Sequence, residues 1–205
     1  MNTRPRSLTL PPSIKGLLVV IALSGALWLL WLRYKQFLTQ GRRPPLSSQI
    51  LERLEKKGMP DFSLTDLDGD KISLSKYHDK VVILNFWASW CDPCVAEFPS
   101  LVKLVQHYKG RLVLIGVSAD YSLSDIQLFL KTFKASHQPN VYIIWDKDEK
   151  LAKRYGTFRL PESYVIGPNG RLIRKIAGVE NWASSDAYAF FDDLLLRSGH
   201  SRKPL

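Results

Sequence analysis

The stretch Val81-Val82-Ile83-Leu84-Asn85-Phe86-Trp87-Ala88-Ser89-Trp90-Cys91-Asp92-Pro93-Cys94 decides the fold. Its first half is a short apolar run, which predicts a strand buried inside a sheet. The only two cysteines of the chain follow directly and stand three positions apart. Pro93 suits the first turn of a helix, where its missing N–H costs no hydrogen bond. The stretch therefore predicts a strand, a turn and a helix that begins at the cysteine pair.

The chemistry of the pair follows from this placement. At a helix N-terminus, unpaired backbone N–H groups and the helix dipole favour a thiolate, so we expect Cys91 to be the exposed nucleophile. Pro93 stiffens the loop and keeps the sulfur of Cys94 within bonding distance. Half of a zinc site is one alternative, although the histidines show no ligand spacing and no second cysteine pair exists. Two inert core cysteines are the other, although a position between strand and helix is typical of redox motifs.

An apolar segment near the N-terminus predicts a membrane anchor. Gly16 to Leu32 carry no charged residue, and Trp28 and Trp31 suit a membrane interface. We predict one transmembrane signal-anchor over residues 14–38. A cleaved signal peptide is the alternative, but Arg33-Tyr34-Lys35 rather than a small-residue cleavage site follows the apolar core.

The net charge of +10 comes mostly from the membrane-proximal part of the chain. Seven Lys and Arg residues and no acid fall in residues 1–46, which leaves 22 cations against 19 acids in residues 47–205. The lipid bilayer is therefore the expected partner of the excess charge, and nucleic acid is not. Cations flank the apolar segment on both sides, so the charge count does not decide its orientation.

The remaining pattern predicts an α/β domain. We divide the chain into a basic N-terminal segment (1–13), the anchor (14–38), a linker with a short helix (39–58), the folded domain (59–197) and a tail (198–205). Within the domain, a hairpin precedes alternating elements, expected as strands at 81–88, 111–119, 141–145, 162–166 and 172–177 and helices at 91–108, 122–133, 147–155 and 183–196. This order requires a central mixed sheet flanked by helices, with an N-terminal β-hairpin extension.

Three motifs carry a resemblance to a known family. They are the stretch Asn85–Pro99 around the cysteines, Met59-Pro60-Asp61-Phe62 before the hairpin, and Leu160-Pro161-Glu162-Ser163-Tyr164-Val165-Ile166 before and within a strand. Together they resemble the membrane-anchored thioredoxin-like TlpA/ResA/CcmG family of thiol-disulfide oxidoreductases. The resemblance implies a thioredoxin-like fold, a cis peptide bond at Pro161 and disulfide exchange by Cys91 and Cys94.

Glu97 is the third expected catalytic residue. It lies three positions after Cys94, so on a helix the two side chains share a face and the carboxylate can sit beneath the sulfurs. Burial would raise its pKa and let it take or return the proton of Cys94. The alternative is an exposed acid on the helix surface.

Four further residues are expected around the pair. If Pro161 is cis, Leu160 presents a backbone edge beside Cys91, where a substrate peptide can add as a short strand. Trp90 would shelter the disulfide and bind substrate, or it could belong to the core. The charge of Asp92 opposes the Cys91 thiolate, so it would raise the pKa of that thiol and make the protein more reducing.

These observations predict a membrane-anchored enzyme that reduces disulfides in extracytoplasmic proteins, with the Cys91/Cys94 disulfide as its redox group and with no metal or other cofactor. The resemblance implies apocytochrome c or a copper-site assembly protein as substrate and a membrane electron donor of the DsbD or CcdA type. It also implies a single pass through a bacterial inner membrane. The alternatives are a Cu(I) metallochaperone that uses the same cysteine pair and a general thioredoxin-like reductase.

Overall fold

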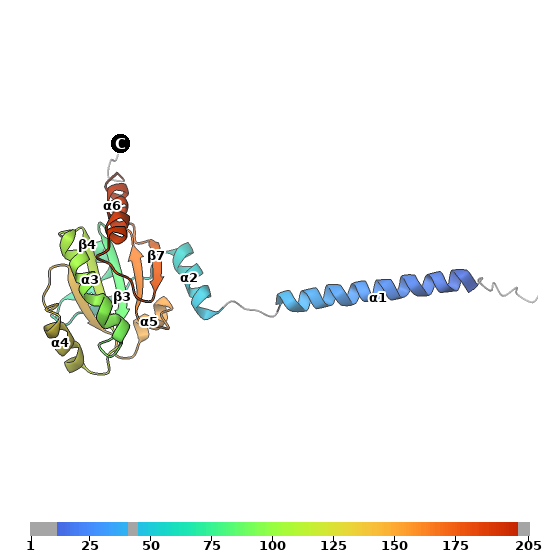
Figure 1. The fold of residues 1–205 in the computed structure, drawn as a ribbon, viewed down its shortest axis with the longest axis horizontal. Coiled ribbons are helices and arrows are strands. Elements are labelled where there is room, and N and C mark those ends of the chain that lie inside the picture. Colours follow the sequence, from blue (N-terminus) through green and yellow to red (C-terminus); the bar gives the residue numbers. More distant parts are fainter. Residues whose placement is uncertain (1–11, 41–44, 201–205) are drawn as a thin grey trace, which may run out of the picture. The chain divides into compact units, whose positions relative to one another are not determined.

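In a computed structural model of the chain, which describes residues 12–40 and 45–200, the apolar run forms strand β3 (Val81–Trp87) at the centre of a sheet. The sheet has five strands in the order β5-β4-β3-β6-β7 (Figure 1). On one side of β3, β4 (Leu112–Ser118) and β5 (Val141–Trp145) run parallel to it. On the other side, β6 (Glu162–Ile166) is antiparallel to β3 and to β7 (Leu172–Ala177). The expected mixed sheet is confirmed.

Strand β3 contributes to two hydrophobic cores because its side chains alternate between the two faces of the sheet. All seven of its residues are buried. Val81, Ile83 and Trp87 join a cluster with residues of three helices, α3 (Asp92–His107), α4 (Leu123–Thr132) and α6 (Ser185–His200). Val82, Leu84 and Phe86 join a second cluster with residues of α2 (Leu46–Lys57), η1 (Leu74–Tyr77) and α5 (Lys150–Tyr155). Helices therefore cover both faces, as expected.

The predicted hairpin forms a separate two-stranded sheet of β1 (Ser63–Thr65) and β2 (Lys71–Ser73). Asp66 closes its turn, because one carboxylate oxygen accepts the backbone N–H groups of Asp68 and Asp70. Gly69 has a φ of 91°, a conformation that glycine adopts without strain.

Two helices begin two or three residues later than the sequence predicts. The helix expected from residue 147 begins at Lys150, because Asp146 accepts the backbone N–H of Glu149 on its carbonyl and that of Ala152 on its carboxylate. The helix expected from residue 183 begins at Ser185, and Ser184 Oγ accepts the N–H of Ala187. In both places a polar side chain that precedes the helix accepts a backbone N–H of its first turn, which the hydrophobic pattern alone does not reveal.

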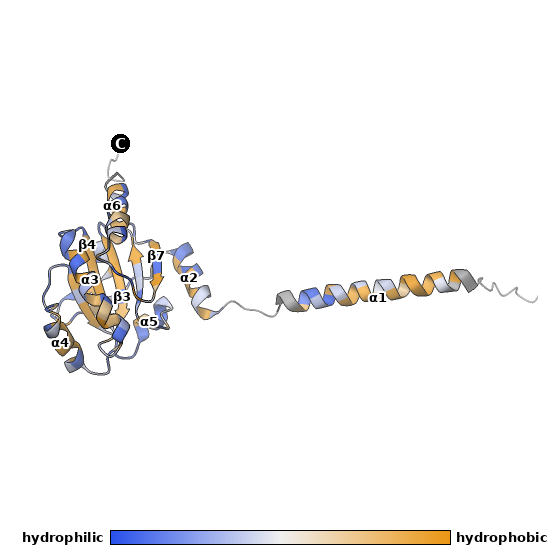
Figure 2. Cartoon of the chain, in the orientation of Figure 1, coloured by the Kyte–Doolittle hydropathy of each residue, from blue (hydrophilic) through white to orange (hydrophobic). Residues whose placement is uncertain are grey.

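Helix α1 (Pro12–Gln40) belongs to a second unit that ends at Pro45, and the folded domain begins at Leu46. Within α1, the segment Gly16–Phe37 has a mean hydropathy of 2.0, and none of its residues is buried within the protein. Apolar residues dominate most of this helix (Figure 2). It is long and apolar enough to cross a bilayer, and it contains the expected anchor at 14–38. Parts of the expected N-terminal segment, linker and tail (1–11, 41–44 and 201–205) lie outside the described residues.

Candidate active site

The two cysteines form a disulfide at the start of α3. Cys91 has an extended backbone and caps the helix, and its Sγ accepts the backbone N–H of Cys94 at 3.3 Å. Asp92 and Pro93 occupy the first helical turn and are exposed. The strand, turn and helix predicted from the sequence are therefore present. The sulfur of Cys91 lies at the helix N-terminus, where backbone N–H groups lack a partner within the helix.

The two sulfurs differ in their access to solvent. Cys91 is 7% exposed and Cys94 is 1% exposed. The expectation of an exposed Cys91 is therefore wrong in degree, because most of this residue is buried in the hydrophobic cluster that also contains Cys94. The order of exposure still matches the expected roles, since only Cys91 retains accessible surface through which a second protein could approach.

A groove of about 590 Å³ opens beside Cys91. One wall comes from the cysteine motif and the other from the segment Phe158–Leu160, which precedes Pro161. The Leu160–Pro161 peptide bond is cis, as the resemblance implied. The two walls meet because β6 pairs with β3, which places Glu162, the residue after Pro161, opposite Phe86.

Exposed aromatic side chains flank this groove. Trp90 is 51% exposed and stacks on Tyr121, with ring centroids 5.8 Å apart and an angle of 14° between the planes. Phe158, on the opposite wall, is 55% exposed. The alternative of Trp90 as a core residue is therefore wrong. Exposed aromatic surface beside a disulfide is suited to binding another protein. Tyr121 was missed because only the order of the strands brings its loop to the cysteine motif.

Glu97 lies buried in the protein, 2% exposed. The alternative of an exposed helix acid is therefore wrong. The indole N–H of Trp182 donates to Glu97 Oε1, and the backbone N–H of Trp182 donates to Ser100 Oγ at 3.1 Å. Burial raises the pKa of Glu97 to about 7, while the Trp182 hydrogen bond and the backbone of Glu180 act in the opposite direction. The carboxylate can therefore gain or lose a proton near neutral pH.

A second buried carboxylate holds the turn that precedes the cysteines. Asp120 accepts the backbone N–H of Ser89 at 3.0 Å, the Ser89 hydroxyl at 2.5 Å and the Ser118 hydroxyl at 2.6 Å. The side chain is fully buried and so depends on these donors. We did not identify Asp120 from the sequence. Ser118 ends an otherwise apolar strand and Asp120 follows it, and this change to polar residues could have pointed to Asp120.

Within the described residues, no three His, Cys, Asp or Glu side chains gather into a group that could hold a metal ion. The redox chemistry that the geometry does provide is that of the disulfide. Cys91 borders the groove, Cys94 is shielded, and a carboxyl with a pKa raised to about 7 stands three residues after Cys94 on the same helix. This arrangement is suited to thiol-disulfide exchange.

Comparison with known proteins agrees with this geometry. The model of the AhpC/TSA family matches residues 56–175. The thiol-disulfide oxidoreductase ResA of Bacillus thuringiensis is 34% identical over 133 residues, which are 64% of this chain and 75% of that protein.

Two solved structures are also similar to the chain. One, described as a thiol:disulfide interchange protein DsbE of Chlorobium tepidum, gives a TM-score of 0.58 at 28% identity and covers 69% of this chain and 94% of its own. An exposed lipoprotein thioredoxin of Streptococcus pneumoniae gives 0.54 at 27% identity and covers 67% and 99%. The chain belongs to the AhpC/TSA family, and it is a thioredoxin-like thiol-disulfide oxidoreductase related to ResA.

Proposed function

We propose that this enzyme is anchored in the bacterial inner membrane by α1 and reduces disulfides of proteins outside the cytoplasm. The observation that carries the proposal is the asymmetric disulfide, in which Cys91 reaches the groove and Cys94 lies buried on the same helix as Glu97. In this arrangement one sulfur meets the substrate and the other completes the reaction out of contact with solvent.

The working state is the dithiol. The Cys91 thiolate attacks one sulfur of the substrate disulfide, and the other substrate sulfur leaves as a thiolate. Glu97 takes the proton of Cys94, and the resulting thiolate attacks Cys91 Sγ. The mixed disulfide breaks, the second substrate thiolate leaves, and two electrons have passed from the enzyme to the substrate. A pKa near 7 lets Glu97 accept this proton and later return it.

The substrate binds along the edge at Leu160 and Pro161. An extended segment of the substrate adds there as a short strand, held by backbone hydrogen bonds. Trp90, which lines the same groove, provides apolar contact. The negative charge of Asp92, in the first turn of α3, opposes a thiolate at Cys91 and so favours a reducing enzyme.

The proposed substrates are the haem-site cysteines of apocytochrome c or the cysteines of a copper-site assembly protein, and a membrane donor of the DsbD or CcdA type returns the electrons. The apolar helix α1 and the similarity to an exposed lipoprotein thioredoxin support a domain outside the cytoplasm. The copper-chaperone alternative gains no support from the relatives, which are named as oxidoreductases.

A trapping experiment tests the reaction and the substrate together. Cys94→Ala removes the resolving sulfur, so a mixed disulfide between Cys91 and the substrate should accumulate and can be identified by mass spectrometry. Cys91→Ala is the matched control and should trap nothing. Equal trapping by both variants, or none by either, would contradict the proposed division of roles. Preferential alkylation of Cys94 over Cys91 by iodoacetamide in the reduced protein would contradict it as well.

The orientation has its own test. Alkaline phosphatase fused after Leu205 matures only in an oxidising space, so an active fusion is the expected result. A fluorescent cytoplasmic reporter at the same site should stay dark. The reverse pattern would place the domain in the cytoplasm and remove cytochrome maturation from its tasks.

A further inference from the structure

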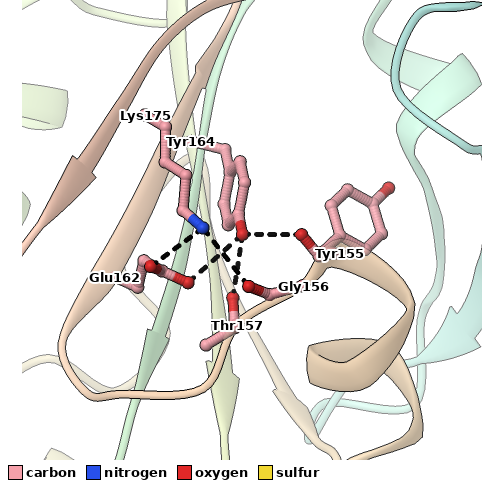
Figure 3. A network of polar contacts seen from close by, with 6 residues as sticks. All are labelled: Tyr155, Gly156, Thr157, Glu162, Tyr164 and Lys175. Carbon is pink, nitrogen blue, oxygen red and sulfur yellow. Dashed lines mark hydrogen bonds and ion pairs between the residues drawn. The ribbon is translucent and has the colours of Figure 1, made fainter. Parts of the chain in front are cut away.

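A partly buried lysine contacts both ends of the loop that carries the proposed substrate edge. Lys175 of β7 places its Nζ 2.9 Å from Glu162 Oε1 and donates to the carbonyl oxygen of Gly156 at 3.3 Å (Figure 3). The side chains of Lys175 and Glu162 are only 14% and 8% exposed. This is the one ion pair among the described residues in which both partners are largely withdrawn from solvent.

The two partners of Lys175 stand at the two ends of one loop. Gly156 ends α5 with a φ of 73°, and Glu162 begins β6 directly after the cis-proline. Between them, Phe158–Leu160 forms the wall of the groove beside Cys91. A single ammonium group therefore joins both ends of the segment that carries the substrate edge.

Packing holds only one end of this segment. Leu160 packs against both hydrophobic cores, whereas Phe158 and Arg159 are exposed. Phe158–Leu160 also borders the groove of about 590 Å³ beside Cys91 and a second hollow of about 460 Å³ that Lys175 lines. The position of the exposed part therefore depends on how the ends of the segment are attached.

The attachment is completed by a tyrosine hydroxyl. Tyr164 Oη lies 2.7 Å from the carbonyl oxygen of Tyr155, 3.1 Å from Thr157 Oγ1 and 3.2 Å from Glu162 Oε2. Lys175 donates to one carboxylate oxygen of Glu162, and the other oxygen shares the single hydroxyl hydrogen of Tyr164 with the Tyr155 carbonyl (Figure 3). A buried polar network in which the members are paired fixes one geometry, because each alternative leaves a polar group unsatisfied.

We propose that Lys175 is a positioning residue that holds the edge at Leu160 and Pro161 in register for polypeptide substrates. The inference rests on the proposed function, in which substrates add as a strand at that edge. A buried ion pair is not required for stability, since a well-packed apolar pair can be as stable. The ammonium group instead fixes a geometry, because it forms an ion pair with Glu162 and donates a hydrogen bond to the Gly156 carbonyl. Small disulfides that reach Cys91 without pairing to the edge should not depend on this link.

The test compares two substrates and two variants of the full chain in detergent. Lys175→Met keeps a long apolar side chain and removes the ammonium. Relative to the unaltered enzyme, it should raise KM for the reduction of insulin about tenfold. The kcat/KM for glutathione disulfide should stay within about twofold, because a misplaced edge affects only substrates that bind along it. Arg174→Met removes the same charge from the neighbouring position of β7, where Arg174 is exposed over the Phe190 ring. It should leave both substrates unaffected.

Two further variants keep the result decisive. Lys175→Arg retains the charge and should restore most of the insulin KM. If Lys175→Met does not fold, Glu162→Gln replaces it, since this isosteric change weakens the same link and should raise KM for insulin selectively. Equal losses for both substrates, or an unchanged insulin KM in the folded variant, would overturn the role of Lys175. An unaltered enzyme that fails to reduce insulin at all would instead refute the proposed function.

Discussion

Two buried glutamates flank the active site, and they differ in what they face. Glu97 lies three residues after Cys94, and Glu162 directly follows the cis-proline. They are similarly buried, at 2% and 6% exposed. Glu97 meets a neutral indole donor, whereas Glu162 meets the ammonium of Lys175. Burial without a cation raises the pKa of Glu97 to about 7, so that residue can exchange a proton near neutral pH. Glu162 instead forms an ion pair with Lys175, which links the two ends of one loop.

The largest expected effect comes from removing the cation. Lys175→Met leaves buried Glu162 without a cation and with only the Tyr164 hydroxyl beside it, so the free energy of unfolding should fall by about 3 kcal/mol. Arg174→Met should change it by less than about 0.5 kcal/mol, as is usual for a surface position. Urea unfolding followed by tryptophan fluorescence measures both. If the two variants lost similar amounts of stability, Glu162 would not depend on Lys175. The contrast drawn between Glu97 and Glu162 would then be wrong.

The second effect is the pH dependence caused by Glu97. Its pKa is raised from 4.5 to about 7 on folding. Below pH 4.5 both states carry the proton. Between pH 4.5 and 7 only the folded state retains it, so stability falls as the pH rises, by about 3 kcal/mol in all. Glu97→Gln should abolish this slope in the oxidised protein.

In the reduced protein, the same Glu97→Gln variant should slow turnover, because the acceptor for the Cys94 proton is lost. Unfolding and insulin reduction measured from pH 5 to 9 provide both readouts. Profiles unchanged from the unaltered enzyme would leave Glu97 with a structural role only.

The third effect tests the indole. Trp182→Phe keeps an aromatic ring but removes the hydrogen bond that lowers the pKa of Glu97. In a plot of the free energy of unfolding against pH, the decline caused by Glu97 ends near the pKa of the folded protein. In this variant that end point should rise by about one pH unit. Trp87→Phe is a matched control, because the buried indole N–H of Trp87 has no hydrogen-bond partner among the described residues. It should lower stability without moving the midpoint, and a shift in both variants would show that the indole hydrogen bond is not the cause.

The smallest effect concerns Asp120, a buried carboxylate that has hydroxyl and N–H donors in place of a cation. Ser89→Ala removes one donor and leaves the Ser89 N–H and the Ser118 hydroxyl in place. We expect a loss of about 1 kcal/mol in the free energy of unfolding. Ser124→Ala, at an exposed site, should cost less than about 0.5 kcal/mol. A loss of several kcal/mol for Ser89→Ala would mean that Asp120 relies on each donor separately.

Much of the fold followed from local patterns. The apolar run Val81–Phe86, the turn signals and the helical spacing predicted the mixed sheet and its order of elements, which the structure confirms. The same stretch predicted the disulfide at the head of α3. The family resemblance supplied the cis bond at Pro161, which is also present.

The sequence by itself determined the redox pair, because two cysteines three positions apart between a strand and a helix meet through local backbone geometry alone. It could not determine their neighbours. Tyr121, Lys175 and Trp182 lie 30 to 91 positions away from Cys91 along the chain. They reach the site only because of the order in which β3, β4, β6 and β7 lie and the way the following segments pack back onto them. Hydrophobic periodicity specifies which face of an element is buried, but the identity of the side chain that meets a buried carboxylate depends on contacts between distant segments, and those exist only in the folded chain.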